Sequence, residues 1–253
     1  MKEKWRLLLT GFQWGPYNMA LDEAVLNSVS EGKSPPTLRL YGWNPPCVTV
    51  GYFQSLAAEV DVRLCRQLGV DVVRRMTGGG AVYHKEEVTY SVHVPEAHPI
   101  TPKNILESYR LICQGLTKGL THLGINSEFA PLNDIITNGK KISGNAQTRR
   151  KNVLLQHGTV LLNVDVDEMF KVLLVPNEKQ KGRVIQDVKQ RVTSASEILK
   201  RDVKFDETQK ALKKGFEEAL HITLTEGSLT QQEKEETAEL QAKYSSDAWN
   251  NKR

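Results

Sequence analysis

The chain has 253 residues, of which 39% are hydrophobic and 25% are charged, and its formal net charge is +4. This length allows one large or two small domains with a sizeable core. The weak positive charge does not indicate nucleic-acid binding, and no apolar run reaches the roughly 18 residues that a membrane-spanning helix needs. The apolar stretch near the N-terminus is also too short for a secretory signal. Three widely spaced cysteines, Cys47, Cys65 and Cys113, match no metal-binding motif, so we expect a cytoplasmic protein without nucleic-acid or membrane partners.

Helix and strand patterns alternate in the first half of the chain. Asn18 can cap a helix whose apolar residues recur on one face and which ends before Pro35 and Pro36. A short helix is expected to end at Gly69, because glycine readily takes the left-handed conformation that closes a helix. Runs rich in β-branched and aromatic residues predict strands at 38–43, 47–53, 70–75 and 88–94.

The second half begins with a long helix, expected from about Asn104 to Leu123 and ended by Gly124. The Asn-Gly pair at 138 and 139 predicts a hairpin turn, and residues 153–164 have a further strand pattern. Three later helices carry capping-box pairs, Ser194 with Glu197, Asp206 with Gln209 and Thr230 with Glu233. We therefore predict one α+β domain over residues 1–253. Mixed or antiparallel sheets are packed with helices, and a small helical segment runs from about residue 190 to 253.

The stretch "RRMTGGGAVYH" places three successive glycines, Gly78, Gly79 and Gly80, between two strand patterns. Backbone N–H groups without neighbouring side chains can form a concave anion site, and arginine pairs well with phosphate or carboxylate oxygens. Because consecutive strand residues face opposite sides, only one of Arg74 and Arg75 can serve such a site. A tight turn would also use glycine, and the run fits neither a P-loop nor a dinucleotide fingerprint.

Two further stretches combine polar residues with small ones. In "GKKISGNAQ", Lys140 and Lys141 are adjacent in an expected strand, so one of them points inward. Ser143 and Gly144 allow a ligand or a neighbouring strand to approach closely, although a solvated lysine pair at a hairpin end is the simpler interpretation of the lysines alone. In "LLQHGTVLL", His157 interrupts an apolar strand, where a histidine is more often a satisfied core residue than a catalytic one.

Together these three stretches, in this order, resemble the lipoate–protein ligase and octanoyltransferase family, whose fold is shared with biotin protein ligase. The likeness extends from "NMALDEA" through "YGWNPPCVTVGYFQ" to "YSSDAWN", and so covers nearly the whole chain. It implies that the glycine-rich loop wraps an acyl-adenylate whose lipoyl tail enters an apolar tunnel. Biotin ligase has a different basic glycine loop, which disfavours that alternative.

The resemblance also implies roles for individual residues. The family's lysine that touches both the acyl carbonyl and the phosphate corresponds to Lys141, the expected catalytic residue. Asp134 is a candidate for placing metal or nucleotide, and Lys85 departs from the aspartate that many members carry after the histidine. The other expected substrate and nucleotide contacts are Arg75, Gly78, Gly79, Gly80, Ala81, Val82, Tyr83, Ser143, Gly144 and His157.

The family includes two reactions, and a cysteine distinguishes them. A ligase activates lipoate with ATP to lipoyl-AMP and then transfers the acyl group to a lysine, whereas a transferase holds the acyl group on a cysteine. One transferase branch carries this cysteine three residues before the histidine, where this chain has Leu154. Another carries it in an extra loop before "GKK", where this chain runs directly from "FAP" to "LNDI". The sequence therefore favours an ATP-dependent, Mg²⁺-using lipoate–protein ligase over an octanoyl or lipoyl transferase, or an inactive lipoyl-adenylate-binding scaffold.

The resemblance implies lipoyl-domain proteins as acceptors, such as the acyltransferase subunits of 2-oxoacid dehydrogenases and the glycine-cleavage H protein. Many ligases of the family carry a further C-terminal domain that assists adenylation, but here one capped helix and a short tail follow residue 230. We therefore expect a chain without this accessory domain, and a separate small subunit that supplies it.

Overall fold

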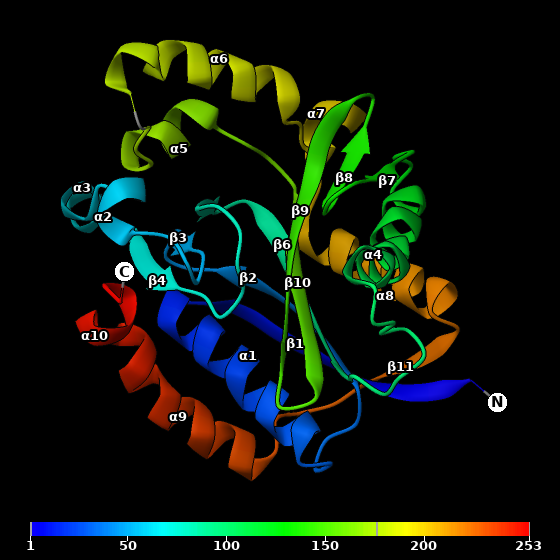
Figure 1. Ribbon diagram of the computed structural model, residues 1–253. Helices are drawn as coiled ribbons and strands as arrows, with labels where there is room; N and C mark the ends of the chain where they lie inside the picture. Colours follow the sequence, from blue (N-terminus) through cyan, green and yellow to red (C-terminus); the bar gives the residue numbers. More distant parts are fainter. Residues whose placement is uncertain (1, 176, 253) are drawn as a thin grey trace.

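The computed structural model describes residues 2–175 and 177–252. Its strands form an eight-stranded sheet in the order β11-β1-β2-β6-β10-β9-β8-β7 and a smaller sheet in the order β4-β3-β5 (Figure 1). The strands are β1 (Glu3–Gln13), β2 (Thr37–Trp43), β3 (Cys47–Val50), β4 (Asp71–Arg74), β5 (Val82–His84), β6 (Glu87–Pro95), β7 (Glu128–Ala130), β8 (Asp134–Thr137), β9 (Lys140–Arg150), β10 (Val153–Leu161) and β11 (Ile222–Glu226). The helices are α1 (Gly15–Ser30), α2 (Leu56–Glu59), α3 (Val62–Leu68), α4 (Ile105–His122), α5 (Val166–Val172), the 3₁₀ turn η1 (Glu178–Gln180), α6 (Lys181–Arg191), α7 (Ala195–Leu199), α8 (Phe205–Ala219), α9 (Gln231–Ser245) and α10 (Asp247–Asn250).

Both sheets contain parallel and antiparallel pairs. In the large sheet β1 runs parallel to β2 and β11, while β2, β6, β10, β9, β8 and β7 follow one another antiparallel. In the small sheet β3 is parallel to β4 and antiparallel to β5. The α+β class with mixed sheets, predicted from the sequence, is confirmed.

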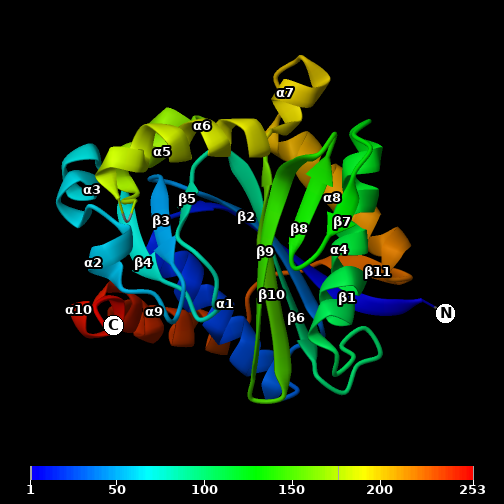
Figure 2. The ribbon, with the colours of Figure 1, turned by 45° about the horizontal axis from the view of Figure 1, so that its top comes forward.

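Helices cover both faces of the large sheet, which explains why β2 is buried along its whole length. One apolar cluster joins the sheet to α4 and α8, and a second joins it to α1 and α9 (Figures 1 and 2). In β2, Leu38 and Leu40 belong to the first cluster, whereas Tyr41 and Trp43 belong to the second. The alternation of side chains along a strand thus supplies both layers of the core.

The segment after residue 190 is integrated into this core. Strand β11 pairs with β1, and α9 lies against α1, where Lys243 Nζ is 2.5 Å from Glu23 Oε2. A buried ion pair of 2.6 Å between Arg6 and Glu233 joins the start of α9 to β1. The segment expected to be helical therefore also contributes a strand to the large sheet.

Most local signals in the sequence are confirmed. Gly69 follows α3 with a φ of 67°, and the side chain of Asn104 caps α4. Asn138 and Gly139, with φ values of 50° and 75°, form the turn between β8 and β9. The expected capping box is present at the start of α9.

Two of the expected caps are wrong. Helix α1 begins at Gly15 because Pro16 suits the first helical turn. Asn18 is instead buried, and its side-chain amide donates hydrogen bonds to the carbonyl oxygens of Gln13 and Gly42. Helix α8 begins at Phe205, so Asp206 lies within its first turn rather than before it.

The chain passes from the large sheet to the small one between β2 and β3. Strand β4 then leads through the glycine loop, defined here as residues 78–81, into β5. Helix α5 packs on the small sheet through an apolar cluster that includes Val48, Val50 and Phe170. Within residues 2–175 and 177–252, no helix combines the length and apolar character needed to cross a bilayer.

Candidate active site

A cavity of about 300 Å³ lies between the two sheets and is bounded by α5 and α6. Small-molecule sites span roughly 300–1,000 Å³, so it suits a small ligand. Its apolar wall consists of Met19, Tyr41, Trp43, Ala81, Val82, Leu161, Val164, Met169, Val188 and Val192. Its polar groups are Thr49, Arg75, Tyr83, His84, Thr89, Asn133, Lys141, Asn145, His157 and Thr159. The composition favours a ligand with an apolar tail and a polar reactive end.

Arg75 holds the glycine loop in place. Its Nη2 donates to the carbonyl oxygens of Gly78 (2.8 Å) and Gly80 (2.7 Å). Its Nη1 donates to the Thr49 carbonyl and hydroxyl oxygens, and its Nε to Thr77 Oγ1. A guanidinium has five N–H donors, and in this structure all five have acceptors within the protein. The nucleotide contact expected from the sequence stays a prediction. Burial lowers the pKa of Arg75 to about 10, and the side chain remains charged at neutral pH.

The neighbouring Arg74 points the other way, as the alternation along a strand requires. It is fully buried and donates to the carbonyl oxygens of Trp249 and Asn250 in α10, and to those of Gly51, Tyr52 and Gln54. Of the two arginines, only Arg75 therefore faces the cavity.

Close packing and backbone conformation explain one glycine of the run, Gly79, but give no steric reason for glycine at positions 78 and 80. A Cβ atom on Gly51 would lie 2.1 Å from the carbonyl oxygen of Gly79, so the loop rests directly on the backbone that follows β3. Gly79 has a φ of +96°, and a Cβ there would also lie 2.9 Å from Arg75 Nη2. By contrast, nothing lies within 4 Å of a Cβ placed on Gly80. The loop thus needs glycine at position 79 for its own folding, before any ligand is considered.

A chain of buried hydrogen bonds runs from helix α1 to Arg75. His157 Nδ1 lies 3.4 Å from Asp22 Oδ2, and His157 Nε2 lies 2.7 Å from Thr77 Oγ1, which accepts from Arg75. Burial lowers the pKa of His157, so the imidazole is neutral at pH 7. The sequence expectation of a substrate contact at His157 is compatible with its place in the cavity wall.

A second chain of the same kind reaches Arg75 from the other side. His84 Nδ1 lies 2.7 Å from Glu87 Oε1, and His84 Nε2 lies 2.9 Å from Thr49 Oγ1, which also accepts from Arg75. Two carboxylate–histidine–threonine chains therefore converge on one guanidinium, which in turn fixes the glycine loop.

Asp22 anchors the first chain as a buried anion. Burial acts to raise its pKa, but the guanidinium of Arg39 and the hydrogen bond from His157 outweigh this effect and hold the pKa well below its ordinary value. Arg39 Nη1 lies 2.8 Å from Asp22 Oδ1, and Ser91 and Tyr41 also donate to the carboxylate. Sequence analysis missed Asp22 and His84, although "NMALDEA" and the last letter of "RRMTGGGAVYH" contain them.

Lys141 is a partly exposed cation of the cavity wall. Its side chain is 40% exposed, and its Nζ lies 2.7 Å from Asp134 Oδ1. A Cβ on Gly144 would lie 2.8 Å from this ammonium, so the glycine leaves it room. Lys140 instead faces outward and pairs with Glu197 at 3.3 Å. The structure therefore separates the two lysines as the strand pattern predicts.

Most of the expected site residues share this wall. Those that line the cavity are Arg75, Gly79, Gly80, Ala81, Val82, Tyr83, Lys141, Gly144 and His157. Gly78 and Asp134 lie beside it, through their contacts with Arg75 and Lys141. Ser143 does not line it: the residue is fully buried and is paired across the strands with Ile135, a member of the apolar core.

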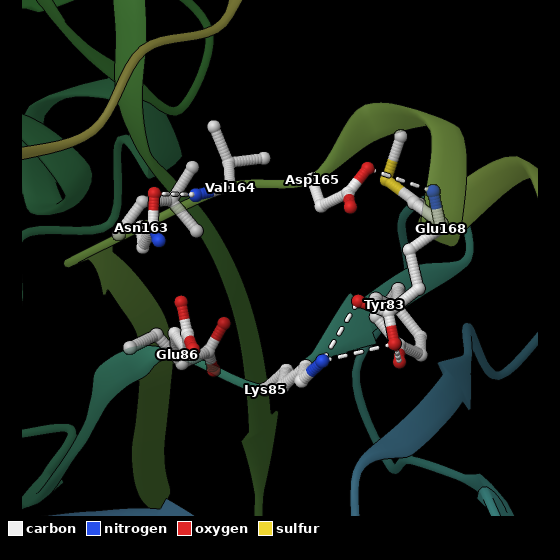
Figure 3. Close-up of a pocket in the computed structure, with 10 residues that line it drawn as sticks. Tyr83, Lys85, Glu86, Asn163, Val164, Asp165 and Glu168 are labelled. Carbon is white, nitrogen blue, oxygen red and sulfur yellow. Dashed lines mark hydrogen bonds and ion pairs between the residues drawn. The ribbon is translucent and has the colours of Figure 1, made fainter. Parts of the chain in front are cut away.

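A smaller polar pocket of about 180 Å³ adjoins the cavity and shares Tyr83, Leu161, Val164 and Met169 with it. Figure 3 shows Lys85 directed at Glu168, with Nζ 2.8 Å from Oε2, and Tyr83 donating to the same carboxylate at 3.1 Å. Lys85, the departure noted in the sequence, therefore links the end of β5 to α5. Among residues 2–175 and 177–252, no group of three or more histidine, cysteine, aspartate or glutamate side chains could hold a metal ion.

Comparison with known proteins identifies one family for this chain. Residues 15–217 match the family described as the lipoyl protein ligase A/B catalytic domain. The octanoyltransferase LipM of Geobacillus kaustophilus is 42% identical over 100% of this chain and 99% of its own length. The LipM of Bacillus subtilis is 39% identical over the same shares.

The similar solved structures are named as ligases. The structure described as a bi-partite lipoate protein ligase and its E2 lipoyl domain from Thermoplasma acidophilum has a TM-score of 0.89 and 34% identity, and covers 98% of this chain and 96% of that one. Lipoate-protein ligase A bound with ATP has a TM-score of 0.85 and 32% identity, with 98% of both chains covered.

The predicted ATP-dependent ligase reaction is wrong. Curated relatives that are 38–42% identical over nearly their full length are octanoyltransferases, and they are closer in sequence than the ligase structures at 32–34%. The prediction treated the missing cysteine as decisive. The chain still has no cysteine at either position, since residue 154 is leucine and residues 129–135 contain none. The alignment with the Geobacillus protein spans 276 positions, 23 more than the 253 residues present here.

Proposed function

Because the chain belongs to the lipoyl protein ligase A/B catalytic-domain family, we propose that it transfers an octanoyl group to a lysine of a lipoyl-domain protein. The LipM relatives match it along nearly their entire length, which supports the same reaction. The observation that carries the proposal is the apolar cavity with Lys141 and His157 in its wall.

The cavity accounts for selection of a medium-length acyl group. Met19, Leu161, Met169, Val188 and Val192 offer an apolar wall for the tail. Each buried methylene group contributes about 0.8 kcal/mol, which favours octanoate over short acids. The polar end of the acyl group then lies towards Lys141 and the glycine loop.

Lys141 supplies the charge that acyl transfer requires. As an amine attacks the acyl carbonyl, negative charge develops on the carbonyl oxygen, and a fixed or nearby cation stabilises it. The Lys141 ammonium can turn from Asp134 to this oxygen because its side chain is partly exposed and Gly144 leaves space beside it.

The acceptor follows from the family and from a structural neighbour. The Thermoplasma ligase is described together with an E2 lipoyl domain, and we propose a lipoyl domain as the acceptor here. The separate accessory subunit expected from the sequence has no support for this chain. The LipM relatives align with this chain alone over 99% of their length.

The test is an acyl-transfer assay with the purified chain. Octanoyl-N-acetylcysteamine thioester and a lipoyl domain are mixed without ATP, and the domain is examined by mass spectrometry. We expect octanoylation of the acceptor lysine, and none on a domain in which that lysine is arginine. Modification with free lipoate and ATP, but not with the thioester, would overturn the proposal.

A further inference from the structure

We infer that Asn250, in the C-terminal helix α10, is a positioning residue for acyl transfer. Asn250 belongs to the stretch "YSSDAWN" and does not line the cavity. It acts through Arg74 and the turn that follows β3, which together set the place of the glycine loop. The inference rests on the proposed function and adds to it a residue remote from the reacting groups.

Helix α10 completes the edge of the small sheet, where both ribbon views show it beside β4 (Figures 1 and 2). Strand β4 is an edge strand of that sheet, and the Arg75 N–H donates inward to the Val50 carbonyl oxygen. The backbone groups of Arg74 therefore point outward, where an edge strand needs partners. Its N–H donates to Asn250 Oδ1 at 2.7 Å, and its carbonyl oxygen accepts from Trp249 Nε1 at 2.8 Å.

The guanidinium of Arg74 joins α10 to the turn after β3, here called the support segment (residues 51–54). It donates to the Asn250 carbonyl oxygen at 2.7 Å. Its Nη1 also donates to the carbonyl oxygens of Gly51 at 2.8 Å and Gln54 at 2.7 Å. Arg74 is fully buried, and a buried charge is costly without partners, so these contacts hold α10 and the support segment together.

The glycine loop rests on the support segment. The Tyr52 N–H donates to the carbonyl oxygen of Thr77, close before the loop, at 2.8 Å. A Cβ on Gly51 would lie 2.1 Å from the carbonyl oxygen of Gly79, so the two backbones touch with no side chain between them. Gly79 in turn lines the cavity. Contacts therefore run from α10 through the support segment to a wall of the acyl site.

The two neighbouring arginines hold the glycine loop from opposite sides. Arg75 binds the carbonyl oxygens of Gly78 and Gly80 on the cavity side. Arg74 fixes the support segment on the other side. Since Gly79 has no side chain to interlock with its surroundings, these backbone contacts determine where it lies. An acyl donor that packs on the loop meets a preformed wall only while both arginines hold it, and preorganisation lowers the cost of binding.

Substitutions at position 250 separate the contact with β4 from a contact with α9. The Asn250 side chain accepts from Arg74 through Oδ1 and donates through Nδ2 to the Tyr244 carbonyl oxygen at 2.9 Å. Asn250→Ala removes both hydrogen bonds, whereas Asn250→Asp keeps the acceptor for Arg74 and loses only the donor. Both variants should unfold at a lower temperature than the parent, but only Asn250→Ala should loosen the glycine loop. Trp249→Phe, which removes the other hydrogen bond to the Arg74 backbone, takes the place of Asn250→Ala if that variant does not fold.

The first measurement is hydrogen exchange in the folded chain, read by mass spectrometry on peptides that cover residues 76–83. We expect Asn250→Ala to speed exchange there about fivefold, the effect of losing one hydrogen bond. Glu233→Gln is the control for lost stability, because it weakens the buried ion pair with Arg6 at the other end of α9. It and Asn250→Asp should stay within about twofold of the parent. Unchanged exchange in Asn250→Ala, or equal acceleration in all three variants, would overturn the inference.

The second measurement is the initial rate of transfer from octanoyl-N-acetylcysteamine to a lipoyl domain by the same proteins. We expect Asn250→Ala to raise KM for the thioester about fivefold with a smaller change in kcat. Asn250→Asp and Glu233→Gln should keep the parent KM. An unchanged KM in Asn250→Ala, or an equal rise in all three variants, would leave Asn250 with a role in stability alone and overturn the inference.

The two measurements also separate this inference from the proposed function. If the parent chain transfers no octanoate under any condition, the proposed function fails. Hydrogen exchange does not depend on that reaction, so unchanged exchange in Asn250→Ala overturns the inference even in a chain that transfers octanoate.

Discussion

The ammonium of Lys141 and the carboxylate of Asp134 lie 2.7 Å apart at the wall of the cavity, on neighbouring strands β9 and β8. This ion pair is partly exposed, so it costs little to break when a substrate carbonyl competes for the ammonium. Asp134 therefore keeps Lys141 near the reacting end of the cavity without fixing it there.

We expect Lys141→Ala to lower kcat for octanoyl transfer by roughly 10²–10³-fold, the range for loss of one oxyanion donor. Lys140→Ala is the matched control, because Lys140 lies next in the chain but pairs with Glu197 at the surface. Steady-state rates of both variants test this. Equal activity of the two would remove Lys141 from the mechanism.

The glycine loop offers a matched pair of substitutions. Gly79→Ala would strain a φ of +96° and press on Arg75, whereas Gly80→Ala meets open space. We expect Gly79→Ala to lower the midpoint of thermal unfolding and to weaken octanoyl transfer, while Gly80→Ala stays close to the parent in stability. If the two variants unfold at the same temperature, close packing does not explain the glycine at position 79.

The length of the acyl group accepted should depend on α6. Val188 lines the cavity, and Val188→Trp is expected to fill part of it. The ratio of kcat/KM for octanoyl over hexanoyl thioester should fall, by roughly fourfold for each methylene group displaced. Gln186→Trp, at an exposed position of the same helix, is the control and should leave the ratio unchanged.

The buried histidines make stability depend on pH. Burial lowers the pKa of His93 to about 4, against about 6.5 in the unfolded chain. As the pH falls from about 6.5 towards 4, the unfolded state gains a proton first, so the free energy of unfolding should decrease over this window. Urea unfolding at several pH values measures this decrease.

His93→Gln should reduce that slope, whereas His122→Gln, at a surface position paired with Glu218, should preserve it. His157, whose pKa burial also lowers, contributes to the slope in the same direction. A slope that is unchanged in His93→Gln would mean that other groups control acid stability.

Local structure could be predicted from the sequence where a residue is required by the backbone conformation at its own position. The Asn-Gly turn, the glycine after α3 and the capping box of α9 need only their own backbone conformations, and all three are found. The caps expected at Asn18 and Asp206 were wrong because a nearby residue determines where each helix begins. Pro16 starts α1 earlier, and Glu207 accepts from the backbone N–H of Lys204 at the start of α8.

The sequence by itself determined the family, the α+β class, and the separation of Arg74 from Arg75 and of Lys140 from Lys141, because strand alternation and motif order are properties of the chain alone. Only the tertiary structure showed that every N–H group of the Arg75 guanidinium donates a hydrogen bond within the protein. The acceptors lie in β3, the glycine loop and Thr77. The cavity likewise joins Met19, Trp43, Leu161 and Val188, which lie far apart in sequence and meet only when the two sheets and α6 close around one space.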